Sequence, residues 1–276
     1  MLGLSYMPGH WLLNKTISAA RSAWYQASDK TALILGRIGW VDAPLPLVSV
    51  YIPTHNRREL LIQRSIKSVL RQSYRNTEVI VVGHGCTDGT NLAVIGEFFK
   101  DGRVRYVSIP RRETYPPTVE NHWCAGRVVP ANVGLSECRG EWIATNDDDD
   151  IWTDDHIESL LKLARAGDYE FVSGAHEANG LRVPPYDLSG VRVGGIQTWL
   201  YRSYLKSFKF NPDCWRKTWN KVCDTDLQDR FRKAGVRMGY LDKVVTNILP
   251  RPGESSIGLA AAKANKDKYL KHLTFK

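Results

Sequence analysis

The chain has 276 residues, a formal net charge of +9 and 43% hydrophobic residues. This composition suits one large α/β domain or two small ones, and it excludes a chain that is disordered along its length. The five cysteines are widely spaced without a C-x-x-C pair, so the sequence indicates neither a disulfide framework nor a zinc site.

No run of about 18 apolar residues occurs, and the N-terminus lacks the order of a signal peptide. We therefore expect a soluble or peripheral protein in a reducing cytosol. No nucleic-acid-binding motif accompanies the positive charge, so we expect no nucleic-acid partner. Basic residues at both termini favour ordinary solvated surface, and they leave peripheral contact with the inner membrane face as the alternative. These residues are Lys15, Arg21, Lys30 and Arg37, and then Lys263, Lys266, Lys268, Lys271 and Lys276.

The first part of the chain predicts an N-terminal extension followed by alternating strands and helices. Residues 1–44 lack a strong period, end in a Pro-containing segment and are expected to be partly helical. The order of elements after them is β-α-β-α-β with apolar strands, which predicts a doubly wound, mainly parallel sheet. The strands are predicted at 47–52, 78–82 and 104–109, and the helices at 60–72 and 91–99.

The acidic run Asp147 to Asp150 follows directly after the next predicted strand, at 141–145. A Pro- and Arg-containing loop at 110–130 and a short helix near 132–138 precede that strand. Open α/β sheets bind ligands at the carboxyl ends of their strands, so the acidic run is expected at a binding edge.

The remainder of the chain predicts an acceptor-facing half and a basic tail. A helix is expected at 154–167, a strand at 169–175, loops and short strands at 179–222, a helix at 224–235 and a strand at 236–241. We therefore expect one domain at 45–252, with a donor and metal half at about 47–175 and an acceptor half at about 176–252. Residues 253–276 are expected to form a basic helical tail.

Four consecutive carboxylates repel one another unless a cation or hydrogen bonds offset their charge. Mg²⁺ or Mn²⁺ prefers such oxygen ligands and keeps coordination sites for the oxygens of a diphosphate. The alternative to a metal site is a solvated acidic turn with no binding role. Trp152 stands where a calcium-sensor loop needs Gly, which excludes that site. A phosphatase with a carboxylate nucleophile remains conceivable, although nothing nearby supplies its basic partner.

Several segments, taken in order, resemble family 2 glycosyltransferases, which have the GT-A fold with a Rossmann-like nucleotide-binding half. "VSVYIPTHNRRELLIQRSIKSVLRQSYRNTEVIVV" is similar to the family's opening strand, turn, first helix and second strand, with His55 where an aromatic residue is usual. "ANVGLSECRGEWIATNDDDDIWTDDHIESLL" is similar to its Asn-x-Gly helix, strand and acid motif. With "CDTDLQDRFRKAG", the resemblance covers most of residues 47–251.

The resemblance implies roles for individual residues. Asp147 and Asp149 match the metal-binding acids, with Asp149 the more direct ligand, and Asp148 and Asp150 stand beside them to substitute or assist. Asp224 matches the catalytic base. The turn at Pro53, Thr54 and Asn56 matches the nucleoside contact, and Asp88 matches the acid that closes the second turn. Asp147 and Asp148 are also counted among the nucleotide-binding residues. Further candidates for diphosphate or acceptor contacts are Asp150, Arg127, Arg251 and Trp152.

One departure from the family pattern concerns the nucleotide base. Many relatives carry two acids after the second strand, where this chain has Gly83 and His84. His84 is counted among the nucleotide-binding residues; it would bond to or stack on a base, or it would only cap a turn. A dinucleotide fingerprint is not formed here, because the third Gly is absent and the turn follows the second strand.

Together these patterns predict a metal-assisted, inverting glycosyltransferase that takes a sugar from a nucleotide-sugar donor. The acceptor would be a saccharide, lipid-linked or other hydroxyl in polysaccharide, glycolipid or glycoconjugate synthesis. Two alternatives remain: a nucleotidyltransferase that makes sugar nucleotides, and a catalytically silent nucleotide-binding protein. The turn "PTHNRR" argues against the first, and the retained acids argue against the second.

Overall fold

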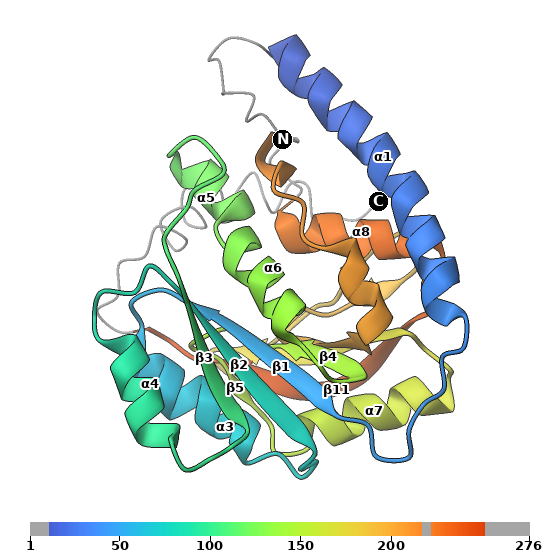
Figure 1. Ribbon diagram of the computed structural model, residues 1–276. Coiled ribbons are helices and arrows are strands. Elements are labelled where there is room, and N and C mark those ends of the chain that lie inside the picture. The colour runs from blue at the N-terminus through green and yellow to red at the C-terminus, as the bar shows by residue number, and fades with distance from the viewer. Residues whose placement is uncertain (1–10, 217–221, 252–276) are drawn as a thin grey trace.

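The computed structural model describes residues 11–216 and 222–251. A nine-stranded sheet with the order β3-β2-β1-β4-β10-β6-β11-β5 runs through the domain, with β7 paired to β6. Helices cover both faces of this sheet (Figure 1). Within the described ranges, no helix is both long enough and apolar enough to cross a membrane.

The first half of the sheet is parallel. Its four neighbouring strands are β1 (Val48–Thr54), β2 (Thr77–His84), β3 (Val104–Ile109) and β4 (Trp142–Thr145). Strands of a parallel sheet are covered on both faces, which is why β1, β2 and β4 are apolar and almost wholly buried. The prediction of a β-α-β order is confirmed here. The connecting helical segments are α2 (Arg58–Leu60), the π-helical η1 (Leu61–Ile66), α3 (Lys67–Leu70) and α4 (Thr90–Phe98).

Two helices occupy the region between β3 and β4. The expected loop at 110–130 is partly wrong, because α5 (Val119–Ala125) lies inside it. Thr118 caps this helix by accepting a hydrogen bond from the backbone N–H of Asn121 at 3.2 Å. The next helix, α6 (Val128–Glu137), starts earlier than predicted and packs on β1 and β2, on the face opposite α3 and α4 (Figure 1).

The second half of the sheet is mixed rather than parallel. The short strand β10 (Trp199–Arg202) runs antiparallel to both β4 and β6 (Phe171–Ala178), and β11 (Met238–Ile248) runs parallel to β6. The sequence pattern had assigned β10 to a region of loops and short strands. The remaining elements here are β5 (Ile151–Trp152), β7 (Leu181–Val183), β8 (Tyr186–Asp187), β9 (Arg192–Val193), the helices α7 (His156–Ala166) and α8 (Cys223–Ala234), and the 3₁₀ turns η2 (Ile196–Thr198), η3 (Ser203–Phe208) and η4 (Cys214–Arg216).

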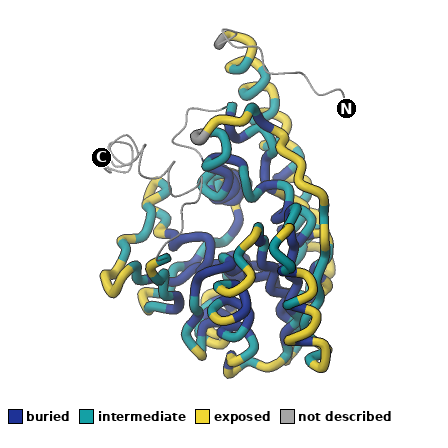
Figure 2. The backbone as a smooth tube through the Cα atoms, turned by 90° about the vertical axis from the view of Figure 1, so that its left-hand side faces the viewer, coloured by how far each residue is buried: buried dark blue, intermediate teal, exposed yellow. Residues whose placement is uncertain are grey.

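The sheet separates two apolar clusters. Along β2, Ile80 and Val82 enter one cluster while Val79 and Val81 enter the other, as the two-residue period of a strand requires. Figure 2 shows these buried segments in the interior of the domain. Trp199 lies in this core with no exposed surface, so the structure gives it a packing role.

The predicted N-terminal extension contains one long helix, α1 (Trp11–Arg37), which packs against η3 and α8. Asp29 accepts two hydrogen bonds from the Arg230 guanidinium, at 2.7 and 2.8 Å, and Arg37 donates two to Glu170, at 2.6 and 2.7 Å. The predicted helical tail at 253–276, and residues 1–10 of the extension, lie outside the described residues.

Candidate active site

The acidic run follows β4, the strand at which the sheet changes from parallel to antiparallel pairing. Strands β1 and β4 are parallel neighbours, so their carboxyl ends meet at one edge, and β10 on the other side of β4 is antiparallel. The turn after β1 begins at His55, and the run Asp147 to Asp150 lies between β4 and β5. Ligand sites of open α/β sheets form at such an edge.

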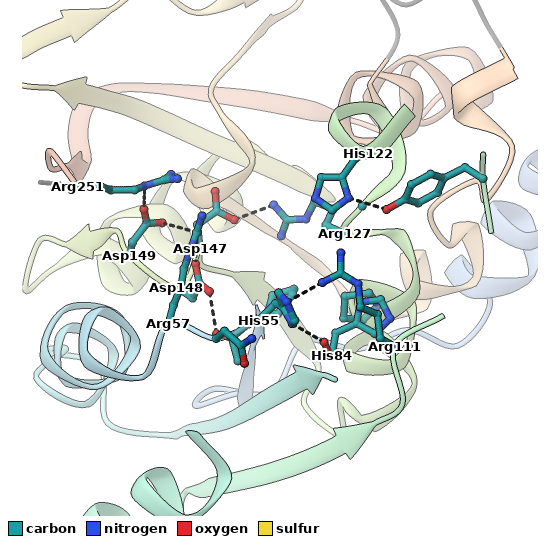
Figure 3. Close-up of a pocket in the computed structure, with 16 residues that line it drawn as sticks. His55, Arg57, His84, Arg111, His122, Arg127, Asp147, Asp148, Asp149 and Arg251 are labelled. Atoms are coloured by element: carbon teal, nitrogen blue, oxygen red, sulfur yellow. Dashed lines mark hydrogen bonds and ion pairs between the residues drawn. The ribbon is translucent and has the colours of Figure 1, made fainter. Parts of the chain in front are cut away.

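Arginines face three of the four acids (Figure 3). Asp147 accepts a hydrogen bond from Arg127 at 2.8 Å. Asp148 accepts one from Arg57 at 2.8 Å and a second, also at 2.8 Å, from the Thr54 hydroxyl. Asp149 forms an ion pair with Arg251 and lies 3.8 Å from the Arg57 guanidinium. These positive charges offset the repulsion that four adjacent carboxylates create.

Burial makes the acid cluster costly to keep ionised. The residues Asp148, Asp149 and Asp150 are at most 5% exposed. Burial first, and then the charge of Asp148, raise the pKa of Asp149 to about 6. Burial also raises the pKa of Asp148 and, well above its ordinary range, that of Asp150. Additional positive charge at this position would therefore stabilise the ionised cluster.

The buried acids suit a divalent cation that is shared with a substrate. The carboxylate oxygens of Asp149 are buried, and apart from the ion pairs with Arg251 and Arg57 they accept no hydrogen bond from the described part of the chain. Oδ1 of Asp150 is also buried and accepts no hydrogen bond there. Among the described residues, no three His, Cys, Asp or Glu side chains form a complete metal-binding group. Mg²⁺ and Mn²⁺ sites at substrate phosphates commonly use only one or two carboxylates, so the residues present fit such an ion.

A cavity of about 530 Å³ opens beside the acids. One wall carries Asp147, Asp148 and Asp149, and the turn after β1 forms another wall (Figure 3). The other lining residues come from the end of β2, from the segment between β3 and β4 and, for Arg251, from the segment after β11. In full, the cavity is lined by Pro53, Thr54, His55, Asn56, Arg57, His84, Arg111, Tyr115, His122, Gly126, Arg127, Pro130, Asp147, Asp148, Asp149 and Arg251.

Hydrogen bonds fix the side chains on the wall away from the acids. His55 donates from Nδ1 to the carbonyl oxygen of His84 at 2.8 Å, which leaves its Nε2 to accept from Arg111 at 2.6 Å. Glu113 accepts two further hydrogen bonds from Arg111. His84 Nε2 accepts the backbone N–H of Arg112 at 3.0 Å, so the neutral ring carries its proton on Nδ1. Burial, and then the charge of Arg111, lower the pKa of His84 and favour that neutral form.

The position of Gly83 has no room for a side chain. A Cβ atom added there would lie 1.7 Å from the Tyr106 hydroxyl and 3.3 Å from the Cys86 sulfur. Tyr106 lies on β3 opposite Val81, two residues before Gly83. The ring of Tyr106 therefore fills the space where many family members carry the first of two acids.

The structure brings most of the predicted site residues together and leaves four outside the cavity lining. Nine of them line the cavity: Pro53, Thr54, Asn56, His84, Arg127, Asp147, Asp148, Asp149 and Arg251. Asp88 accepts hydrogen bonds from the backbone N–H groups of Thr90 and Arg58, and thereby joins the starts of α4 and α2. Asp150 is buried, with 2% of its surface exposed. Trp152 is 1% exposed, stacks on His156 and donates to the carbonyl of Gln197 at 2.8 Å.

Asp224, the predicted base, lies in the first turn of α8 and is half-buried. Burial raises its pKa most; the positive charge of Arg127 lowers the pKa, and the negative charge of Asp147 raises it. Asp224 therefore lies within electrostatic range of the acid wall, which we define as the side of the cavity formed by Asp147, Asp148 and Asp149. Asp226, two residues further along α8, is only 2% exposed.

Sequence reasoning missed Arg57, Tyr115 and His122 as lining residues. Arg57 could have been inferred, because it directly follows the turn at 53–56 and precedes a helix. Tyr115 and His122 are joined by a hydrogen bond of 2.8 Å between the phenol oxygen and Nδ1. Their segment has no period that indicates a site, so only the folded structure shows them side by side.

Comparisons with known proteins agree with this geometry. The profile of glycosyl transferase family 2 matches residues 49–116 and 125–228, and the fold is of the GT-A type. The chain therefore belongs to glycosyl transferase family 2.

Individual relatives share only part of their length with this chain. The UDP-Glc:alpha-D-GlcNAc-diphosphoundecaprenol beta-1,3-glucosyltransferase WfgD of Escherichia coli is 30% identical over 131 residues, which is 48% of this chain and 46% of WfgD. The chain spans less than half the length of the curated relatives it matches first.

Two solved structures share the fold at low identity. The structure of S. aureus TarS with UDP-GlcNAc has a TM-score of 0.57 at 19% identity, covering 75% of this chain and 59% of the TarS chain. The mannosyltransferase PcManGT of Pyrobaculum calidifontis, in complex with GDP-Man and Mn²⁺, has a TM-score of 0.57 at 18% identity, covering 88% and 70%.

Proposed function

We propose that this chain transfers a glycosyl group from a nucleotide-sugar donor to an acceptor hydroxyl. One observation carries the proposal: the arginine-bound acids Asp147 to Asp149 and the turn Pro53 to Asn56 face the same cavity in a member of glycosyl transferase family 2. The acids suit a cation and a diphosphate, and the turn lies at the edge of the sheet where nucleotides bind.

The donor diphosphate would lie at the acid wall. Asp149, with Asp147 beside it, would hold Mn²⁺ or Mg²⁺, which as a Lewis acid would neutralise the leaving diphosphate. Arg251 and Arg127 line the same wall, and their guanidinium groups can donate to phosphate oxygens. Asp148 would keep Arg57 and Thr54 in place, since it accepts hydrogen bonds from both.

The nucleoside would lie against Pro53, Thr54 and Asn56, near His84. With Nε2 of His84 occupied by a backbone N–H, its ring offers a donor at Nδ1 rather than the acceptor that a carboxylate offers. The N3–H of uracil needs an acceptor, so we expect weaker selection for uracil than an acid at this position would give. TarS was crystallised with UDP-GlcNAc and PcManGT with GDP-Man, so this fold accommodates more than one base.

Asp224 would act as the general base. Its carboxylate would take the proton from the acceptor hydroxyl as that oxygen attacks the anomeric carbon, and the diphosphate would leave from the opposite face with inversion. Burial raises the pKa of Asp224, which strengthens it as a base. Asp226 is buried on the same helix and is the weaker candidate.

The acceptor would be a saccharide or a lipid-linked saccharide in polysaccharide or glycolipid synthesis. The name of WfgD specifies a diphosphoundecaprenol-linked acceptor, which motivates the lipid-linked class for this chain. All five cysteines are free, which suits a reducing compartment such as the cytoplasm.

The released product distinguishes this proposal from its alternatives. The chain would be incubated with Mn²⁺ and UDP-glucose, UDP-GlcNAc, GDP-mannose or a thymidine diphosphate sugar, with and without an undecaprenyl-diphosphate saccharide. A glycosyltransferase releases the nucleoside diphosphate in an acceptor-dependent manner. Release of inorganic diphosphate from a sugar phosphate and a nucleoside triphosphate would instead identify a nucleotidyltransferase. Donor binding without turnover on any acceptor would support the catalytically silent protein and contradict the proposal.

A further inference from the structure

The helix α1 places polar side chains together with Leu33 and Ala32 against the domain, and it presents a row of large apolar side chains outward. The inward side is held by ion pairs and polar contacts: Arg21 with Asp213 at 2.9 Å, and Asp29 with Arg230. Arg216 also donates to the Asn14 side chain at 2.7 Å. A helix on a water-facing surface normally shows the opposite arrangement, with apolar residues inward and polar residues outward.

The outer side of α1 is a continuous apolar strip. The large side chains of this strip are 42 to 69% exposed within the helix, and exposed alanines and threonines fill the turns between them. They recur at three- and four-residue spacing over roughly 35 Å, at a rise of about 1.5 Å per residue. We define the α1 strip as Leu12, Leu13, Thr16, Ala20, Ala23, Trp24, Ala27, Thr31, Ile34 and Leu35.

The exposed charged side chains of this helix are all positive. Its sole acidic residue, Asp29, is 3% exposed and paired with Arg230, whereas Lys15 and Lys30 are exposed. We propose that the α1 strip docks onto an anionic phospholipid surface, with the helix lying in the plane of the membrane interface. Interfacial helices combine an apolar face that carries Trp and Leu with flanking lysines, as this helix does.

Charge complementarity favours a membrane over the other occupants. A second copy of this chain also carries a formal charge of +9, so two α1 strips would bring like charges together. Residues 252–276 contain five lysines against two acids, so this segment is also positively charged and does not complement Lys15 and Lys30. Anionic lipid headgroups attract both lysines when the helix lies at the membrane surface.

The same helix is joined to the wall of the cavity through a short chain of contacts. Asn14 and Arg21 bind Arg216 and Asp213, which lie in or next to η4. Within η4, Cys214 Sγ lies 3.2 Å from the carbonyl oxygen of Cys124 on α5. The cavity residues His122 and Gly126 stand two residues to either side of Cys124. Docking through the α1 strip would therefore hold the side of the cavity that carries His122 and Gly126 near the lipid surface. The use of this placement for a lipid-linked acceptor rests on the proposed function, whereas the docking itself does not.

Vesicle flotation tests the proposal. The parent would be mixed with vesicles of phosphatidylcholine alone or with about one third phosphatidylglycerol, and then compared with Trp24→Gln/Leu35→Gln. The matched control is Leu92→Gln/Phe99→Gln, which removes two apolar side chains that are 73% and 80% exposed, one on α4 and one directly after it. We expect the parent and the control to float with the anionic vesicles, and the α1 variant to bind them at least about tenfold more weakly.

Other outcomes would overturn the proposal. These are failure of the parent to bind anionic vesicles, equal binding by the α1 variant, and an equal loss in the α4 control. Sedimentation velocity without lipid gives the last such outcome. If the parent is a dimer and the α1 substitutions dissociate it, the strip binds a second copy of the chain and not a membrane. Donor-dependent thermal shifts of all variants would be unchanged if only docking is affected, so failure of docking and failure of the proposed transfer are distinguishable.

Discussion

The half of the sheet that we propose binds the donor (β1 to β4) and the half that we propose faces the acceptor (β10, β6, β11 and β5) differ in how their strands are connected. They are called the donor half and the acceptor half below. In the donor half, β1 pairs with β2 and β2 pairs with β3, so two of its three pairings join consecutive strands, and helical connections pack against the same sheet. In the acceptor half, β10 lies between β4 and β6, and β5 pairs with β11 about 95 residues later. Local pattern therefore specifies the donor half, whereas long-range pairing specifies the acceptor half.

The largest effect that we expect concerns Asp224, the one proposed catalytic group from the acceptor half. Replacing a positioned general base costs about 10² to 10⁴ in rate while ground-state binding is retained. Asp224→Asn should therefore lose turnover in an acceptor-dependent assay and keep donor affinity and folded stability.

Asp226→Asn serves as the comparison, because its side chain lies on the same helix and is buried. If folded Asp226→Asn loses as much turnover as Asp224→Asn, or if Asp224→Asn retains near-parental transfer, the assignment of the base is wrong. An equal loss of donor binding in Asp224→Asn would place this residue with the donor instead.

A second prediction tests how tightly the donor half is packed next to His84, where we propose that the base of the nucleotide binds. Gly83→Ala introduces a Cβ atom 1.7 Å from the Tyr106 hydroxyl, so it should lower the free energy of unfolding by about 1–3 kcal/mol. Gly96→Ala in α4 is the matched control, since no heavy atom lies within 4 Å of the added Cβ. That control should raise stability by about 0.5–1 kcal/mol in urea unfolding, and equal effects of the two substitutions would contradict the packing described for Tyr106.

A third prediction concerns acid stability, through a buried histidine where α7 meets β11. His156 donates from Nδ1 to the carbonyl of Val245 at 2.9 Å, and burial lowers its pKa to about 3. The unfolded chain takes up this proton near the ordinary histidine pKa of about 6.5, whereas the folded chain does not. The contribution to stability is therefore intact above about pH 6.5 and falls by about 1.4 kcal/mol per pH unit as the pH drops toward 3.

The variant His156→Gln isolates this contribution. The slope of unfolding free energy against pH should be shallower in the variant than in the parent between about pH 6 and 4. Because the neighbouring Asp155 is unchanged, its titration contributes to both proteins. Identical slopes would show that His156 is not held neutral in the folded chain.

The same contrast explains what the sequence could predict. The apolar strands β1 and β2, and the acid run after β4, are signalled by residues that are adjacent in the chain, so the edge that carries the site was predictable. Strand β10 has only four residues and is buried on both sides between β4 and β6, so it shows no alternation that identifies a strand. Tyr115 and His122 depend on the start of α5 at Thr118, which is a single capping interaction in a segment rich in proline.

The sequence pattern also could not predict that the apolar side of α1 faces outward. Periodicity identifies the two sides of a helix, but it assumes that the apolar side faces the core. Here Asp29 and Arg21 face the domain, because Arg230 and Asp213, far away in the sequence, supply their partners. Only the folded structure shows which side is exposed.

Binding of the donor through Asp149 tests the central claim most directly. Thermal unfolding would be measured with a nucleotide sugar, with and without Mn²⁺, for the parent, for Asp149→Ala, and for Asp154→Asn as a control with a side chain that is 74% exposed just beyond the cluster. A ligand that binds only the folded state raises the midpoint, so the parent and the control should show a Mn²⁺-dependent increase. Asp149→Ala should fold and lose that increase; an equal Mn²⁺-dependent increase in Asp149→Ala would contradict the proposed role of the acid wall in holding the metal and the donor.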